Sequence, residues 1–299
     1  MRTTLLRRLG LAGSRMAEVS AQARADHRIN GHTPLVFNDP YAFGFLNPNY
    51  KLMVQTPVGR WSGRLTGFHL TFLAGEATMV TRGRYNEEQL TRAISAGVTQ
   101  YVMLGAGFDS FVWRHPNLAA RLRVFEVDQP AAQASKRARA RALGLNEPQN
   151  VIYVPVDLQH DSLRTRLLQS GFEVEKPAFF SWLGTAYYLS REAAESVIDD
   201  ITRCAAPGSW LVFDYMDPKP FSGEKLPALL AKTLFIARAF GEPLQSGMSH
   251  GVVESFLSAR DFHVLERLGP EAVEARYLRD RRDLTTVLPH IHYLTARNG

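Results

Sequence analysis

Three apolar runs in the sequence end in residues that suit nucleoside chemistry. The first run, YVML (101–104), ends in a Gly-x-Gly segment, and the next two end in acids. An acid at the end of a strand can accept hydrogen bonds from both ribose hydroxyls, and an Asp after the next strand can reach an adenine amino group. The residues to which we assign these candidate roles are Gly105, Ala106, Gly107, Glu126, Asp128, Asp157 and Leu158. Glu126 and Asp128 are two apart and are expected to share a strand face. Together, the three strand ends predict a pocket for an adenosine.

The residues after the Gly-x-Gly segment distinguish between two classes of adenosine cofactor. A dinucleotide fingerprint requires a third glycine beside the pyrophosphate, but this sequence reads G-A-G-F-D-S, with Ser110 at that position and Asp109 before it. S-adenosylmethionine carries no phosphate, and its amino-acid tail needs a cationic partner for its carboxylate. Arg82 or Arg84, shortly before the first strand, supplies that cation. The pattern favours S-adenosylmethionine over a dinucleotide.

Strands alternate with helical segments through the centre of the chain, which predicts an α/β fold with a mostly parallel, doubly wound sheet. The strands are expected at 101–104, 122–128, 151–157, 178–183 and 210–215, with two more near FHVLERL and HIHYLTA. Ligands in such sheets bind beyond the carboxyl ends of the strands, where the candidate residues lie.

The remaining segments indicate how the chain is organised. Residues 1–97 are expected to form an N-terminal helical cover, with a helix starting at an Asn86 cap and ending at Gly97. Residues 98–299 are expected to form the core, interrupted by a helical insertion around 216–250. The basic segment MRTTLLRRLGLAGSRM is interpreted as a solvent-facing helical extension, because its arginines interrupt the apolar stretch that a secretory signal needs.

Several motifs in order resemble the leucine carboxyl methyltransferase family and its bacterial O-methyltransferase relatives. They are LGAGFDSFVWR, FEVDQP, VPVDL and SWLGTAYYL, with NDPYAFGFL before them and APGSWLVFDY after them. The resemblance covers most of the chain, from about Ala17 onward. It implies a class I methyltransferase fold, Rossmann-like, with a seven-stranded sheet, one antiparallel strand, helices on both faces and a helical cover over the active site.

The resemblance also implies roles for individual residues. Arg82 would bind the methionine carboxylate, Gly105 would line the amino-acid tail, Asp128 would bind the ribose, and Asp157 with Leu158 would hold the adenine. Tyr188 matches a substrate-side tyrosine of the phosphatase-methylating branch.

Two positions depart from the family pattern. A Glu often precedes the Gly of the fourth-strand motif, where this sequence has Leu183 before Gly184, and an Arg of that branch is replaced by Gln159. These departures affect the identity of the substrate more than the binding of the cofactor.

Composition limits the possible partners and the compartment. The 299 residues carry a formal net charge of +6 without a long Lys/Arg block, so nucleic-acid binding is not expected. No window approaches the ~18 apolar residues of a membrane helix. Cys204 is the only cysteine, so an intramolecular disulfide is impossible, which suits the reducing cytoplasm. The sequence does not predict an oligomeric state.

Histidines and aromatic residues give weaker signals. His69 and His250 lie in regions expected to cover the site, but neither is assigned as a general base. His290 and His292 share a strand face, and without a third ligand in the sequence we interpret them as packing residues and predict no metal site. Trp182 and Tyr187 are equally compatible with core packing and with a substrate pocket.

The sequence therefore predicts an S-adenosylmethionine-dependent O-methyltransferase. The expected acceptor is a carboxyl or hydroxyl group of a small natural product or peptide, and a carboxyl acceptor requires no general base because it is already ionised at neutral pH. The alternatives are a nicotinamide-dependent oxidoreductase and a non-catalytic cofactor-binding or partner-binding module with the same fold.

Overall fold

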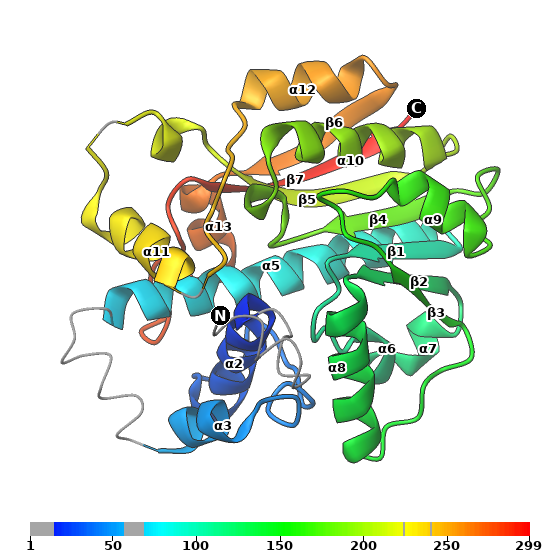
Figure 1. Ribbon diagram of the computed structural model, residues 1–299. Helices are drawn as coiled ribbons and strands as arrows, with labels where there is room; N and C mark the ends of the chain where they lie inside the picture. The colour runs from blue at the N-terminus through cyan, green and yellow to red at the C-terminus, as the bar shows by residue number, and fades with distance from the viewer. Residues whose placement is uncertain (1–14, 57–68, 224, 240) are drawn as a thin grey trace, which may run out of the picture.

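The sheet has seven strands in the order β3-β2-β1-β4-β5-β7-β6 (Figure 1). The computed structural model describes residues 15–56, 69–223, 225–239 and 241–299. The strands are β1 (Gln100–Leu104), β2 (Arg123–Asp128), β3 (Val151–Pro155), β4 (Ala178–Trp182), β5 (Trp210–Met216), β6 (Phe262–Leu268) and β7 (Ile291–Asn298). Only β7 runs antiparallel to its neighbours, so the carboxyl ends of β1 to β5 meet at one edge. This is the expected class I methyltransferase sheet.

Helices cover both faces of the sheet (Figure 1). In the described residues they are α2 (Arg15–Asn30), α3 (Pro48–Gln55), α5 (His69–Ser95), α6 (Phe111–Arg114), α7 (Pro116–Ala119), α8 (Pro130–Ala142), α9 (Leu163–Gln169), α10 (Arg191–Cys204), α11 (Ala228–Ala239), α12 (His250–Ser258) and α13 (Pro270–Tyr277). Two 3-10 turns, η1 (Ala186–Tyr188) and η2 (Lys219–Phe221), follow β4 and β5.

Alternation along each strand divides the core into two layers. In β1, Tyr101 and Met103 join the cluster under α5, α6 and α13, whereas Val102 and Leu104 join the cluster under α9, α10 and α12. Successive strand residues point to opposite faces, so each apolar strand contributes to both layers. The fully apolar strands predicted from the sequence are explained by this two-sided burial.

The helix predicted to begin at Asn86 is longer than expected. Helix α5 begins at His69, and Asn86 lies inside it, with its side-chain Nδ2 donating to the Tyr101 hydroxyl at 3.0 Å. The prediction of an Asn86 cap was therefore wrong. The helix accommodates the polar residues before Asn86, since Thr78 and Thr81 donate to carbonyl oxygens one turn back and their buried hydroxyls are satisfied within the helix.

Asp39 fixes the N-terminal helices to the turn that follows β1. Its buried carboxylate accepts hydrogen bonds from Arg24 Nε at 2.9 Å and from Ser110 Oγ at 2.6 Å. Arg24 also donates to the Phe108 carbonyl at 2.8 Å. Burial alone would raise the pKa of Asp39, but Arg24 and Arg114 outweigh it and lower that pKa. Ser110, which occupies the place of a third glycine, thus holds α2 over the Gly-x-Gly turn.

The extension predicted for residues 1–14 lies outside the described residues, and Arg15 and Met16 begin α2. Among the described helices, none combines the length and hydropathy that a bilayer-spanning segment requires.

Candidate functional site

The Gly-x-Gly turn lies at the carboxyl end of β1, in the centre of the sheet. Gly105 has a φ of +70°, and its backbone N–H donates to the Val127 carbonyl at 2.8 Å. A Cβ atom on Gly105 would lie 2.3 Å from the Thr185 methyl carbon, so both the backbone conformation and the space require glycine. Ala106 N–H shares the Val127 carbonyl at 3.2 Å. The turn therefore brings bare backbone against the loop that follows β4.

Asp128 lies beside this turn at the end of β2. Its carboxylate accepts from the Gly107 N–H at 2.7 Å and from the Gln129 N–H at 2.7 Å. Burial raises the pKa of Asp128, although both hydrogen bonds oppose the shift. The side chain therefore joins the ends of β1 and β2.

Glu126 occupies a different environment from the one expected. Its side chain is 1% exposed and lies 2.6 Å from Nζ of Lys136, a buried residue of α8. A carboxylate taken out of water needs such a partner, and the helix supplies it. Lys136 holds Oε2 of this carboxylate between helix and strand, whereas Oε1 is buried without a hydrogen-bond partner among the described residues. The ligand contact expected for Glu126 stays a prediction.

Arg82 projects from α5 toward the carboxyl ends of β4 and β5. Its Nη1 lies 3.0 Å from Asp214 Oδ2 and 3.2 Å from the Tyr187 hydroxyl. Burial alone would lower the pKa of Arg82, but Asp214 outweighs it and raises that pKa, so the guanidinium is charged. Arg84, the alternative cation, points outward and pairs with Glu88 at 2.6 Å. Of the two arginines, Arg82 is the one that reaches the site.

Asp157 and Leu158 lie beyond β3. Asp157 accepts from the Gln159 N–H at 3.0 Å, and Leu158 packs against the core layer under α9 and α10. The amide of Gln159 is engaged at both ends by Ser190, which caps α10: its Nε2 donates to Ser190 Oγ at 3.2 Å and its Oε1 accepts from Ser190 N–H at 3.1 Å. Gln159 therefore holds the start of α10, and the substrate-side role expected for it has no support in these contacts.

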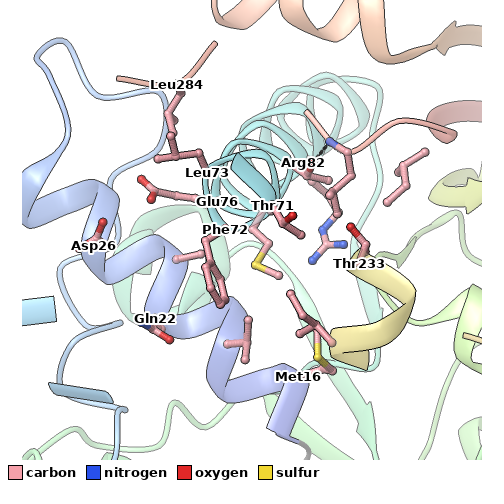
Figure 2. Close-up of a pocket in the computed structure, with 18 of the residues that line it drawn as sticks. Met16, Gln22, Asp26, Thr71, Phe72, Leu73, Glu76, Arg82, Thr233 and Leu284 are labelled. Atoms are coloured by element: carbon pink, nitrogen blue, oxygen red, sulfur yellow. Dashed lines mark hydrogen bonds between the residues drawn. The ribbon is translucent and has the colours of Figure 1, made fainter. Parts of the chain in front are cut away.

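A cavity of about 800 Å³ opens beside Arg82. Its walls come from α2, α5, α11, η1 and the segment that leads into β7 (Figure 2). Figure 2 shows Arg82 of α5 and Thr233 of α11 facing the same space, with Met16 of α2 below them. Tyr187 and Tyr188 line it as well, and their rings lie 5.1 Å apart. The N-terminal helices and the α11 insertion thus form a chamber next to the strand ends.

Of the two aromatic candidates, one lies in the core and the other lines the cavity. Trp182 is fully buried and stacks on Phe213 at 6.1 Å, so it is a core residue, whereas Tyr187 lines the cavity. The side chain of His69 lies outside the described residues. His250 contacts the Tyr215 hydroxyl at 2.7 Å.

Two carboxyl groups line the cavity away from Arg82. Glu76 of α5 faces Asp26 of α2 (Figure 2). Burial, together with the negative charge of Asp26, raises the pKa of Glu76 well above its usual value. Burial also lowers the pKa of His27 to about 4, and its neutral ring accepts from the Val36 N–H at 3.0 Å. His27 therefore does not neutralise Glu76, and this carboxyl is easier to protonate than an exposed one.

The sequence of this chain is similar to those of known proteins. A family model described as leucine carboxyl methyltransferase matches residues 17–202. The chain belongs to the leucine carboxyl methyltransferase family. It is 35% identical to a Bacillus subtilis protein with the name "Putative S-adenosyl-L-methionine-dependent methyltransferase YktD", over 93% of this chain and 95% of that protein. A Mycolicibacterium paratuberculosis relative with the same name apart from YktD is 35% identical over 50% of this chain and 49% of its own length.

A solved structure shows the same fold. It is a DUF574 family protein from Streptomyces avermitilis, with a TM-score of 0.61 and 16% identity, covering 94% of this chain and 97% of that one. Together with the family match, this confirms the class I methyltransferase fold that the motifs implied.

As a member of this family, the chain is an S-adenosylmethionine-dependent methyltransferase that requires a small-molecule or peptide acceptor. Family membership decides against the nicotinamide oxidoreductase that the Gly-x-Gly segment had left open. The residues present fit the cofactor. Thr185 Oγ1, against Gly105, is buried without a hydrogen-bond partner among the described residues, and such an atom is costly unless a ligand satisfies it. Arg82 is a charged group that lines the cavity beside these strand ends.

Two residues that contribute to the site were not singled out in the sequence. Asp214 lies in β5 and is fully buried, with Oδ1 accepting from the Gly184 N–H at 2.6 Å and Oδ2 contacting Arg82. An acid inside the apolar strand WLVFDY was the available signal. Thr185 gave no such signal. This chain has Leu183 at a position where the family often has a Glu. Asp214 nevertheless provides a carboxylate beside Arg82.

Proposed function

We propose that this protein is an O-methyltransferase whose acceptor is a carboxyl or hydroxyl group of a small natural product or peptide. The observation that supports this proposal is the cavity of about 800 Å³ that opens beside Arg82 and Tyr188. Its volume is typical of a chamber for a small molecule or a peptide end. The apolar residues around it, such as Met79 and Leu244, suit an acceptor with a substantial apolar body.

The cofactor-binding residues follow from the strand ends. Arg82 binds the methionine carboxylate, and the backbone of Gly105, Ala106 and Gly107 borders the amino-acid tail. Asp128 accepts hydrogen bonds from the ribose. Asp157 and Leu158 border the adenine. The support for this set is that Gly107 N–H and Asp128 already meet at 2.7 Å, so the ends of β1 and β2 form one continuous surface.

The chain's own contribution to methyl transfer is alignment and exclusion of water. The cofactor, when bound, supplies an electrophilic methyl group on a sulfonium. Helix α2 lies over the turn, since a Cβ on Gly107 would lie 3.2 Å from Ala17 Cβ, and this cover keeps water from the reacting atoms. Holding nucleophile and methyl group in line is worth roughly 7–11 kcal/mol.

The polar lining of the cavity is compatible with both kinds of acceptor. A carboxylate needs a cation to orient it, and Arg282 lines the cavity. A hydroxyl needs a base, and Glu76 is a carboxyl of the cavity whose pKa burial raises well above its usual value. Tyr188 stands beside Arg82 and provides a hydroxyl at the boundary between cofactor and acceptor.

The test is transfer of a labelled methyl group from S-adenosylmethionine to candidate metabolites and peptides. Mild alkali releases methanol from a methyl ester but not from an aryl ether, so treating the product separates carboxyl from hydroxyl acceptors. The proposal expects either an alkali-labile ester or a stable O-methyl ether. A product methylated on nitrogen, carbon or sulfur would overturn it.

Binding of the cofactor is tested separately by calorimetry with S-adenosylhomocysteine. Arg82→Met should reduce the affinity at least about tenfold, because a charge-assisted contact to the tail carboxylate is lost. Arg84→Met is the matched control, since Arg84 pairs with Glu88 on the outside of the same helix and should leave affinity unchanged. Equal affinity of wild type and Arg82→Met would overturn the assignment of Arg82.

A further inference from the structure

A cluster of one carboxylate and three imidazoles lies where β5 ends and β7 begins. Asp217 directly follows β5, His292 is the second residue of β7, and His290 lies just before that strand. His250 starts α12, 33 residues after the acid (250 minus 217). The sequence gives only the His-x-His pair, whereas the fold adds an acid and a third histidine.

The antiparallel pairing of β5 and β7 explains the juxtaposition. Tyr215 pairs with His292 and Met216 with Ile291, so the chain leaves β5 opposite the point where it enters β7. The Asp217 N–H donates to the His290 carbonyl at 2.9 Å, which extends the ladder by one bond. Both histidines of the His-x-His pair are thereby held against the Asp217 carboxylate.

The ligand atoms lie at separations close to those of a metal site. Asp217 Oδ2 is 3.0 Å from His292 Nε2 and 3.4 Å from His290 Nδ1. One ligand atom each from Asp217, His250 and His292 lies within 4.8 Å of the others. Ligands on a tetrahedral zinc ion with bonds of about 2.0–2.1 Å are roughly 3.3 Å apart. A small movement of the His250 side chain toward Asp217 and His292 would therefore bring all three ligand atoms to the spacing that one ion requires.

The backbone at His290 is strained in a way that serves this arrangement. Its φ is +65°, in the left-handed region that is strained for a non-glycine residue. This conformation turns the chain so that both His290 and His292 contact the same carboxylate oxygen. Strain of this kind concentrates at functional sites, and here a group of ligands accompanies it.

The surroundings orient the rings as an outer coordination shell does. The Tyr215 hydroxyl contacts His250 Nδ1 at 2.7 Å, which leaves Nε2 of that ring available. The His250 and His292 rings meet edge to face at 4.3 Å. Arg267, a neighbouring cation, pairs with Glu254 at 3.3 Å, which offsets part of its charge.

We propose that Asp217, His250 and His292 bind a divalent transition-metal ion of the Zn²⁺ class, with His290 beside them against the Asp217 carboxylate. Imidazole and carboxylate are the ligands that suit such ions, and three protein ligands leave the fourth tetrahedral position to water. Met216 and Ile291, which adjoin Asp217 and His292, line the acceptor cavity, so the ion would fix one wall of that cavity. The site holds β5, β7 and α12 together and does not depend on the proposed acceptor.

The experiment uses the full chain without an affinity tag, stripped of metal by a chelator. Calorimetric titration with ZnCl₂ should show saturable binding of one ion per chain, and Zn²⁺ should raise the melting temperature. Co²⁺ in place of Zn²⁺ should give the intense visible absorption of a tetrahedral site. Absence of saturable binding, with the chain folded by circular dichroism, would overturn the proposal.

Single substitutions test which side chains bind the ion. His250→Gln and Asp217→Asn should each weaken Zn²⁺ binding by about 100-fold or more, since each removes a direct ligand and outer-shell changes alone cost 10–100-fold. His160→Gln is the matched control, because His160 is exposed and lies after β3. His250, being only half-buried, should tolerate replacement without unfolding. Equal Zn²⁺ affinity in His250→Gln and His160→Gln would place the ion elsewhere and contradict the proposal.

Binding of S-adenosylhomocysteine by the same stripped protein separates this inference from the methyltransferase assignment. If the metal site is structural, the stripped chain still binds the cofactor product, and the His250→Gln variant does so as well. Loss of Zn²⁺ binding with retained cofactor binding thus identifies the cluster, whereas failure of cofactor binding alone bears only on the strand-end site.

Discussion

Arg82 Nη1 lies 3.0 Å from Asp214 Oδ2, and this pair joins the long helix α5 to the centre of the sheet. Asp214 is fully buried, and the Arg82 side chain is 12% exposed. The other oxygen of Asp214 accepts from the Gly184 N–H at 2.6 Å, so one carboxylate fixes both the cation and the loop after β4. The position of the candidate cofactor-binding cation is therefore set by β5.

Replacement of Asp214 should affect both stability and cofactor binding. Asp214→Ala leaves a buried guanidinium without its counter-charge, and breaking a buried pair costs about 3–5 kcal/mol of the free energy of unfolding. Urea unfolding measures this loss. Glu195→Ala, which removes an exposed pair with Arg191 on α10, is the control and should cost no more than about 0.5 kcal/mol. Similar losses in the two variants would contradict the role of Asp214.

Gly184 should not tolerate a side chain, because Arg82 occupies the space. Its φ is +71°, and a Cβ would lie 2.5 Å from Arg82 Nη1. Gly184→Ala should therefore destabilise the protein and weaken binding of S-adenosylhomocysteine. Gly144→Ala is a matched control, since Gly144 has a φ of +70° with open space around it and pays only the backbone cost of roughly 1–2 kcal/mol. Thermal unfolding and calorimetry of both variants separate strain from displacement of Arg82.

The strands of the sheet could be predicted because the residue pattern that specifies each strand is local in the sequence. Each strand is a short apolar run bounded by polar turns, and the predicted strand at 178–183 corresponds to β4 at Ala178–Trp182. Helix α10 begins after a Ser190 cap whose side chain accepts from the Ala193 N–H, as the serine in the sequence indicated. The start of α5 was missed because threonines that donate to their own helix carry no sequence signature distinct from a loop.

The candidate site was only partly predictable because the deciding contacts are long-range. Arg82 was chosen from its place before β1, but its partner Asp214 is 132 residues away. Glu126 and Asp128 follow the same pattern in sequence, and only the position of Lys136 on α8 shows that the first is held inside the protein. Spacing along a strand predicts the face of a residue, but not which side chain of another element it meets.

Removing the Glu76 carboxyl should stabilise the protein in a pH-dependent manner. Burial and then Asp26 raise the pKa of Glu76 above 4.5 in the folded state. The neutral form of Glu76 contributes stability that is fully present below the pKa of this carboxyl in the unfolded chain. That contribution is lost as the pH rises through the pKa of Glu76 in the folded protein. Glu76→Gln does not titrate, so its free energy of unfolding should exceed that of wild type by more near neutral pH than at about pH 4.5.

Urea unfolding at a series of pH values measures the difference between Glu76→Gln and wild type. Glu175→Gln provides the control, because Glu175 is exposed and should show no trend of this size. A difference for Glu76→Gln that stays constant with pH, or that shrinks as pH rises, would contradict the raised pKa of Glu76.

The Thr185 hydroxyl should matter for binding rather than for folding. Oγ1 is buried without a hydrogen-bond partner among the described residues, and it lies against Gly105 at the centre of the cradle. Thr185→Val keeps the shape and removes the unsatisfied oxygen, so stability should be unchanged or raised by about 1 kcal/mol. If the hydroxyl faces the cofactor, affinity for S-adenosylhomocysteine should fall by roughly five- to tenfold, the equivalent of about 1–1.4 kcal/mol for one neutral hydrogen bond.

Thr202→Val gives the opposite combination and serves as the control for Thr185→Val. Thr202 donates to the Asp199 carbonyl at 2.9 Å within α10, away from the cradle. Its replacement should lower the free energy of unfolding slightly and leave cofactor affinity unchanged. Calorimetry and thermal unfolding of both valine variants therefore show whether the Thr185 hydroxyl contributes to cofactor binding or to folding. If Thr185→Val destabilises the protein while retaining full affinity, its hydroxyl is satisfied within the protein and does not contact the cofactor.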